Sequence, residues 1–93
     1  MRALTIYSRP GCHLCDDMKA VVKRAVNRLA QTSSEPIAVD EVDITTDAQL
    51  ESLYGLEIPV LLLDGRKIAK YRIGEDELRR VLTGRAGGAG GAG

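Results

Sequence analysis

The stretch YSRPGCHLCDDM, residues 7–18, contains both cysteines of the chain, Cys12 and Cys15. A proline and a glycine directly before the pair end a short apolar strand, and from Cys12 onward the apolar residues recur with a helical period. Cysteines at this spacing have three common uses, which are metal coordination, a structural disulfide and reversible thiol–disulfide exchange. The choice among these uses decides the fold class as well as the function.

The apolar pattern on either side of this stretch predicts alternating strands and helices. The apolar stripe of the helix after Cys12 consists of Leu14, Met18, Val21, Val22, Ala25, Val26 and Leu29. The predicted elements are a strand at 3–8, this helix to about residue 30, a strand at 37–44, a helix at 47–54, strands at 60–63 and 67–71, and a helix at 75–83. The order β-α-β-α-β-β-α in so short a chain predicts an α/β fold with a four-stranded mixed sheet flanked by three helices.

Turn residues mark the boundaries of these elements. Asp64-Gly65 is a two-residue hairpin signal between the last two strands. Gly55 is predicted to take the left-handed conformation just after the second helix. Residues 84–93, GRAGGAGGAG, contain six of the ten glycines and no large apolar side chain, so we expect a folded domain at 1–83 and a disordered tail at 84–93.

Composition and charge limit the classes of function. The 93 residues are 44% hydrophobic, as in a single small globular domain. Thirteen basic and thirteen acidic side chains cancel, so neither nucleic acid nor an anionic membrane surface is an expected partner. The amino terminus has too short an apolar run for a secretory signal, and no stretch reaches the roughly 20 apolar residues of a membrane-spanning helix. We therefore expect a cytoplasmic protein, and a monomer.

The metal and structural uses of the cysteine pair find little support. A mononuclear zinc site needs about four Cys, His or carboxylate ligands, whereas the chain has one CxxC and a single histidine, His13, directly after Cys12. Zinc would therefore need carboxylates or another subunit, and we expect no metal. A purely structural disulfide is disfavoured in a reducing cytosol, and the ring closed between Cys12 and Cys15 is too small to stabilise a fold strongly.

Thiol–disulfide exchange fits the spacing. On the first turn of a helix, residues i and i+3 lie about 5–6 Å apart on one face, within the range that a disulfide accepts. Cys12 lies at the helix N-terminus, where free N–H groups and the dipole favour a thiolate, whereas Cys15 is on the apolar side. Arg9 and a protonated His13 would lower the pKa of Cys12 further, and Asp16 would raise it. We therefore assign the attacking role to Cys12 and the resolving role to Cys15.

Ile58-Pro59 precedes the third predicted strand, where a proline lacks the N–H for sheet pairing. From the residues alone a trans peptide is favoured there, since cis occurs in about 5–6% of X–Pro bonds. YSRPGCHLC, however, resembles the active-site stretch of glutaredoxins, which have a basic residue three places before the first cysteine. Ile58-Pro59 resembles the Thr-Val-Pro segment of that family, and Arg72-Ile73-Gly74 resembles the start of its arginine-isoleucine-glycine-glycine turn.

This resemblance spans residues 1–83 and implies a thioredoxin-like fold, a redox-active dithiol and a cis proline. The residues that it places at the substrate and glutathione site, besides Cys12 and Cys15, are Arg9, His13, Ile58, Pro59, Gly74 and Asp76. In that pattern Arg9 meets the glycine carboxylate of glutathione, and the main chain of Ile58 pairs with the cysteinyl residue like an added strand. Gly74 and Asp76 would hold the γ-glutamyl carboxylate.

The sequence also departs from the glutaredoxin pattern. His13-Leu14 stands between the cysteines, where the family usually has proline and tyrosine. Glu75 replaces the second glycine of the late turn, and a carboxylate there would repel the carboxylate of glutathione. The chain is therefore similar to a divergent glutaredoxin-like subgroup.

The expected function is that of a thiol–disulfide oxidoreductase, which reduces protein disulfides or glutathione mixed disulfides with glutathione as the reductant. One alternative is a partner-specific redoxin reduced by thioredoxin reductase, which Glu75 favours. Another is a carrier of a [2Fe–2S] cluster held by Cys12 and glutathione, which a non-proline residue at position 13 permits and the presence of Cys15 disfavours. A scaffold with inert cysteines is the third.

Overall fold

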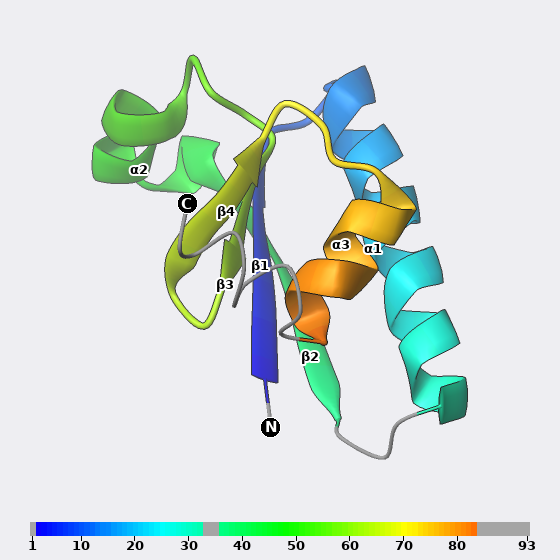
Figure 1. Ribbon diagram of the computed structural model, residues 1–93. Coiled ribbons are helices and arrows are strands. Elements are labelled where there is room, and N and C mark those ends of the chain that lie inside the picture. The colour runs from blue at the N-terminus through cyan, green and yellow to red at the C-terminus, as the bar shows by residue number, and fades with distance from the viewer. Residues whose placement is uncertain (1, 33–35, 84–93) are drawn as a thin grey trace.

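A computed structural model of the chain describes residues 2–32 and 36–83, and the predicted tail at 84–93 lies outside them (Figure 1). The described residues form a four-stranded sheet in the order β2-β1-β3-β4. The strands are β1 (Arg2–Ser8), β2 (Ile37–Asp43), β3 (Val60–Leu63) and β4 (Arg66–Lys70). Because β1 and β2 are parallel while β3 is antiparallel to both β1 and β4, the sheet is mixed, as predicted.

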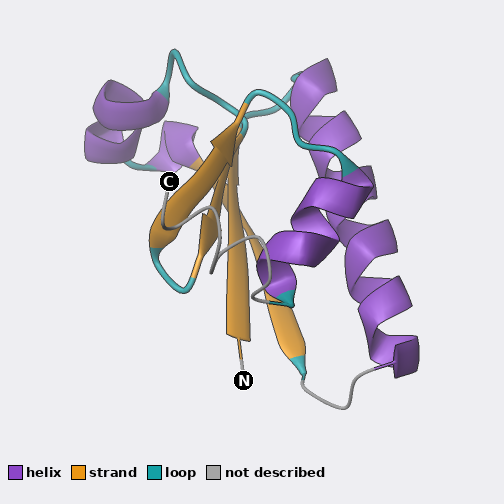
Figure 2. Cartoon of the chain, viewed as in Figure 1, coloured by secondary structure: helices purple, strands orange, loops and turns teal. Residues whose placement is uncertain are grey.

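Three α-helices and a short 3-10 helix complete the described part of the fold. They are α1 (His13–Thr32), η1 (Ile44–Thr46), α2 (Ala48–Tyr54) and α3 (Glu75–Leu82). Figures 1 and 2 show α1 and α3 together on one side of the sheet and α2 on the other. The order confirms the predicted β-α-β-α-β-β-α arrangement. Among the described residues, no helix has the length and apolar character to cross a membrane.

The core lies between the sheet and the pair of helices α1 and α3. Its buried members are Leu4, Ile6, Met18, Val22, Ala25, Leu61, Leu63, Ile73, Leu78 and Leu82. All four residues of β3 are buried, as expected for a strand covered on both faces. The predicted apolar stripe of α1 packs into this core, which fixes the helix that begins next to the cysteine pair.

The two predicted glycine turns had different outcomes. Asp64 and Gly65 have φ angles of 50° and 87°, so the hairpin prediction is confirmed. Gly55 has φ −56° and ψ −30°, so the prediction of a left-handed residue is wrong. The chain continues with right-handed geometry because the Gly55 N–H donates a helical hydrogen bond to the Glu51 C=O (2.8 Å).

Two strand predictions also needed correction. Ile44 belongs to η1 and not to β2, because the Asp43 side chain accepts a hydrogen bond from the Thr45 N–H (2.9 Å) and caps a new helical turn there. The simple alternation expected in the last strand is absent, since Ile68 and Ala69 are both half-buried. A register shift in the pairing of β3 with β4 accounts for two successive residues facing partly inward.

Candidate functional site

The two cysteines lie where the chain passes from β1 into α1. Gly11, with φ 79°, turns the loop after β1, and Cys12 directly precedes the first residue of α1. The Cys12 C=O accepts a hydrogen bond from the Asp16 N–H (3.2 Å), and the Cys12 Sγ accepts one from the Cys15 N–H (3.1 Å). Cys12 thus occupies the N-cap position, where N–H donors and the helix dipole favour a negative charge on sulfur.

Cys12 and Cys15 form a disulfide, with their Cα atoms 5.2 Å apart as the spacing predicted. Cys15 is 1% exposed, whereas Cys12 is half-buried. The predicted difference in access between the two sulfurs is therefore present, and Cys12 is the one that an incoming group can reach.

An ionic network holds the first turns of α1 against the ends of β1 and β2. The Glu41 carboxylate accepts hydrogen bonds from the buried Ser8 hydroxyl (2.8 Å) and pairs with the Lys19 ammonium (3.1 Å). The hydrogen bond from Ser8 is the largest cause that lowers the pKa of Glu41, and the bond to Glu41 is the largest cause that raises the pKa of Lys19. Lys19 also pairs with Asp16 (3.3 Å), so a cation offsets the carboxylate that was expected to disfavour a thiolate at Cys12.

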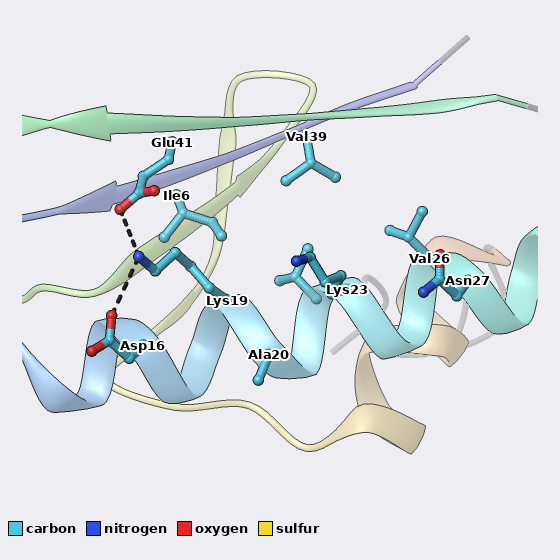
Figure 3. A pocket seen from close by; sticks show the side chains of 10 residues that line it. Ile6, Asp16, Lys19, Ala20, Lys23, Val26, Asn27, Val39 and Glu41 are labelled. Carbon is cyan, nitrogen blue, oxygen red and sulfur yellow. Dashed lines mark ion pairs between the residues drawn. The ribbon is translucent and has the colours of Figure 1, made fainter.

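A hollow of about 670 Å³ lies between α1 and the edge strand β2 (Figure 3). The larger apolar side chains that line it are Ile6, Val22, Val26 and Val39. Figure 3 shows Lys19 between Asp16 and Glu41 at one end. Because neither Cys12 nor Cys15 lines it, the hollow lies beside the predicted redox site and is not part of it.

The Arg9 guanidinium extends toward the end of α2. Its Nη2 donates a hydrogen bond to the Gly55 C=O (3.1 Å), and its buried Nε has no partner among the described residues. The side chain of His13, the first residue of α1, is exposed and contacts none of the described polar groups. The predicted contacts of Arg9 and His13 with glutathione stay predictions.

The Ile58–Pro59 peptide is cis, which confirms the prediction from the family resemblance and shows that the expectation from the residues alone was wrong. β3 begins at the next residue, and Val60 pairs with Tyr7 of β1. Pro59 therefore meets the end of β1, from which the chain leads directly into the cysteine loop. Neither the N–H nor the C=O of Ile58 has a hydrogen-bond partner among the described residues.

Glu75 does not lie free at the start of α3. Its two carboxylate oxygens pair with Arg24 Nε (3.2 Å) and Arg28 Nε (2.9 Å) of α1. The residue that departs from the glutaredoxin pattern therefore joins α3 to α1. Gly74, which directly precedes it, has φ −80° and open space around the position of a Cβ.

Asp76, the other residue predicted near the γ-glutamyl group, is engaged within its own helix. Its carboxylate forms an ion pair with Arg79, and this contact holds the pKa of Asp76 below its usual value. With Glu75 and Glu77, it gives the first turn of α3 three carboxylates. Figure 1 shows the start of α3, the start of α1 and the segment before β3 at the same end of the sheet, so the predicted site residues gather at one edge.

Tyr71 at the end of β4 is a member of this edge that the sequence did not indicate. Its φ is 69°, its N–H donates to the Pro59 C=O (2.8 Å), and its hydroxyl donates to the Leu56 C=O (3.1 Å). An aromatic residue is an improbable choice for positive φ, so no local pattern could have singled it out.

No group of three or more His, Cys, Asp and Glu side chains in the described ranges is placed to hold a metal ion. The chemistry that the arrangement offers is therefore that of the sulfur pair, with an accessible sulfur at a helix N-terminus and a buried sulfur one turn behind.

Comparison with known proteins supports this description. A family model described as "Glutaredoxin-like domain (DUF836)" matches residues 3–83. A "Glutaredoxin-like protein YDR286C homolog" from Dictyostelium discoideum is 31% identical over 75 residues, which cover 81% of this chain and 69% of that protein.

Solved structures with the same arrangement include proteins from two other organisms. The crystal structure of the protein XcR50 from X. campestris is 40% identical, with a TM-score of 0.59 over 86% of this chain and 95% of that one. A mutant thioredoxin from Halobacterium salinarum is 26% identical, with a TM-score of 0.57 over 90% of this chain and 74% of that one. The chain therefore belongs to the family of glutaredoxin-like domains, and its thioredoxin fold with a Cys12–Cys15 pair supports a redox role.

Proposed function

We propose that the protein is a thiol–disulfide oxidoreductase in which Cys12 attacks and Cys15 resolves. The Cys12 thiolate forms a bond to one sulfur of a substrate disulfide, and the other substrate sulfur leaves as a thiolate. The Cys15 thiolate then attacks the Cys12 sulfur, which closes the Cys12–Cys15 disulfide and releases the second substrate thiol. Two electrons pass from the protein to the substrate, and an external thiol restores the dithiol.

The observation that carries this proposal is the state of the Cys12 sulfur. It is accessible, it accepts the Cys15 N–H at the N-terminus of α1, and it is already within bonding reach of a buried partner. These are the properties that activate a cysteine for attack and provide a second thiol for release.

The substrate side of the site is the segment before β3. The unpaired N–H and C=O of Ile58 suit an extended peptide or the cysteinyl part of glutathione, which would add to them like a strand. With glutathione as the substrate or reductant, Arg9, His13, Gly74 and Asp76 are the residues that we propose around its two carboxylates.

A redoxin that takes electrons from a thioredoxin reductase is a second candidate. Three carboxylates in the first turn of α3 surround the place proposed for the γ-glutamyl carboxylate, which disfavours glutathione there. The two candidates differ in the reductant that turns the protein over, which is glutathione alone or NADPH with thioredoxin reductase. If neither reduces the Cys12–Cys15 bridge, both proposals fail.

Two cysteine variants test the roles directly. Reduction of a small glutathione mixed disulfide should be abolished in Cys12→Ser, because no other cysteine is available to attack. Cys15→Ser should retain part of the activity, because glutathione can release the mixed disulfide on Cys12. In the reduced wild type, Cys12 should react with iodoacetamide at about pH 6 faster than free cysteine does. Equal activity of the two variants would contradict the assignment of roles.

A further inference from the structure

Tyr71 holds the segment Leu56–Pro59 at both ends. Its N–H donates to the C=O of Pro59 (2.8 Å), and its hydroxyl donates to the C=O of Leu56 (3.1 Å). One residue that follows β4 therefore fixes a short segment that precedes β3. The segment includes Ile58, whose main chain carries the unpaired groups of the proposed site.

The backbone at Tyr71 is unusual for its residue type. With φ 69° and a hydrogen bond from the Arg72 N–H to the Lys70 C=O (2.8 Å), Tyr71 is the centre of the rarer kind of γ-turn. Lys70 Nζ lies 5.5 Å from the centre of the tyrosine ring, so the ring is also held from the side. A sparsely populated conformation that persists at the edge of a site is a reason to look for a role in that site.

Burial is a weak explanation for this arrangement. The Tyr71 side chain is 43% exposed, and the Leu56 side chain, whose carbonyl it holds, is 94% exposed. The contact thus keeps an aliphatic side chain in solvent next to the unpaired main chain of Ile58. Exposed apolar groups beside unpaired backbone groups are features of surfaces that bind extended polypeptides.

We propose that Tyr71 is a positioning residue for polypeptide substrates. By fastening the segment Leu56–Pro59, it presents the Ile58 main chain and the Leu56 side chain to an extended strand that carries the substrate disulfide. The proposal rests on the oxidoreductase function proposed above and adds the substrate class, a protein disulfide with an apolar side chain close to the reacting cysteine.

The test compares Tyr71→Phe with Tyr54→Phe. Both changes remove one hydroxyl from a tyrosine, but the Tyr54 hydroxyl has no hydrogen-bond partner among the described residues, and its ring packs on Tyr7. With dithiothreitol as reductant and insulin as the protein disulfide, Tyr71→Phe should raise KM about 3- to 10-fold, the loss expected for one hydrogen bond, with kcat within about twofold of wild type. Tyr54→Phe should match wild type.

A small substrate separates docking from chemistry. Reduction of 2-hydroxyethyl disulfide, which is too small to contact the whole segment, should be the same in Tyr71→Phe and wild type, as should the rate of Cys12 alkylation at about pH 6. A KM for insulin within about twofold of wild type, or an equal loss on both substrates, would overturn the proposal.

Leu56 has a matched control in Leu53, another exposed leucine that lies on α2. Leu56→Ser should raise the KM for insulin and leave the small disulfide unaffected, whereas Leu53→Ser should leave both unaffected. If both leucine variants behave alike, the surface beside Ile58 is not the docking place.

The same assay distinguishes failure of this inference from failure of the proposed function. Wild-type activity on insulin no greater than that of Cys12→Ser would remove the oxidoreductase proposal itself. Wild-type activity well above Cys12→Ser, together with an unchanged KM in Tyr71→Phe, would remove only the role of Tyr71.

Discussion

Glu41 shows how much a single carboxylate can depend on neighbours that are remote in the chain. It accepts the hydroxyl of Ser8, the last residue of β1, and it pairs with Lys19, one turn after Cys15. Both partners favour the charged carboxylate, and the pKa of Glu41 is accordingly lowered, chiefly by Ser8. A group of this kind makes the stability of the first turns of α1 depend on pH.

Glu41→Gln should be less stable than wild type at neutral pH, by less than about 1 kcal/mol because the carboxylate is half-exposed and screened. The folded pKa of Glu41 lies below the ordinary value of 4.5. Its contribution is therefore complete above that value and is lost as the pH falls through the lower folded pKa. Urea unfolding midpoints between about pH 3 and 7 should show the two proteins converging in acid.

Glu51→Gln is the matched control, since the side chain of Glu51 is exposed and forms no contact with the described polar groups. Its unfolding midpoint should follow that of wild type across the pH range. If Glu51→Gln and Glu41→Gln differ from wild type in the same way, the contacts to Ser8 and Lys19 are not responsible.

At this scale the sequence predicts what neighbouring residues decide. The unequal exposure of Cys12 and Cys15 follows from four consecutive positions at the start of a helix, and it was predicted. The bond between Ser8 and Glu41 joins residues 33 positions apart, and it depends on the register of β1 with β2. No pattern in the sequence contains that register, so the network could not be anticipated.

The end of α2 illustrates a constraint at the scale of elements. A Cβ on Gly55 would lie 2.5 Å from the Glu51 carbonyl oxygen and 3.2 Å from Arg9 Nη2. The glycine is needed because the Arg9 side chain and the helix end crowd it, and not because of a left-handed backbone. Arg9 thus connects the cysteine loop to α2 through a position that tolerates no side chain.

Gly55→Ala should lower the free energy of unfolding by about 1–3 kcal/mol, the usual penalty for overpacking a filled position. Gly74→Ala is the comparison, because Gly74 has φ −80° and nothing within 4 Å of a Cβ. That change should stay within about 0.5 kcal/mol of wild type. Chemical unfolding of both variants measures the difference, and equal stability would show that Arg9 and α2 do not enclose Gly55.

Elements were predicted best where one face repeats along the chain. The stripe of α1 extends over several turns, and its members pack as the period required. The pairing of Glu75 with Arg24 and Arg28 instead depends on how α3 crosses α1, which periodicity does not fix. Family resemblance supplied the cis peptide before β3, which residue statistics alone opposed.

At the scale of the whole molecule, stability is concentrated between the sheet and the helix pair α1 and α3. Leu61, in the central strand β3, is fully buried in this core. Leu61→Ala should therefore cost about 2–5 kcal/mol, a large share of the stability of a small domain. Leu53→Ala, at a position that is 63% exposed, should stay within about 0.5 kcal/mol. Similar unfolding midpoints for the two variants would contradict this location of the core.

The fold class was predictable because the order of elements leaves few ways to build a small mixed sheet. The convergence of the site at one edge was less so. Tyr71, Pro59 and Cys12 come from three separate connections, and they meet only because β1, β3 and β4 are neighbours in the sheet.

The link between Cys12 and Cys15 closes within a single turn of a helix that is anchored along its length. Gaining or losing that link therefore leaves the outline of the molecule nearly the same. A visiting protein can tell the charged form from the spent form only by the few atoms around one sulfur. The donor of electrons and their recipient then compete for the same small doorway, and they visit it in turn.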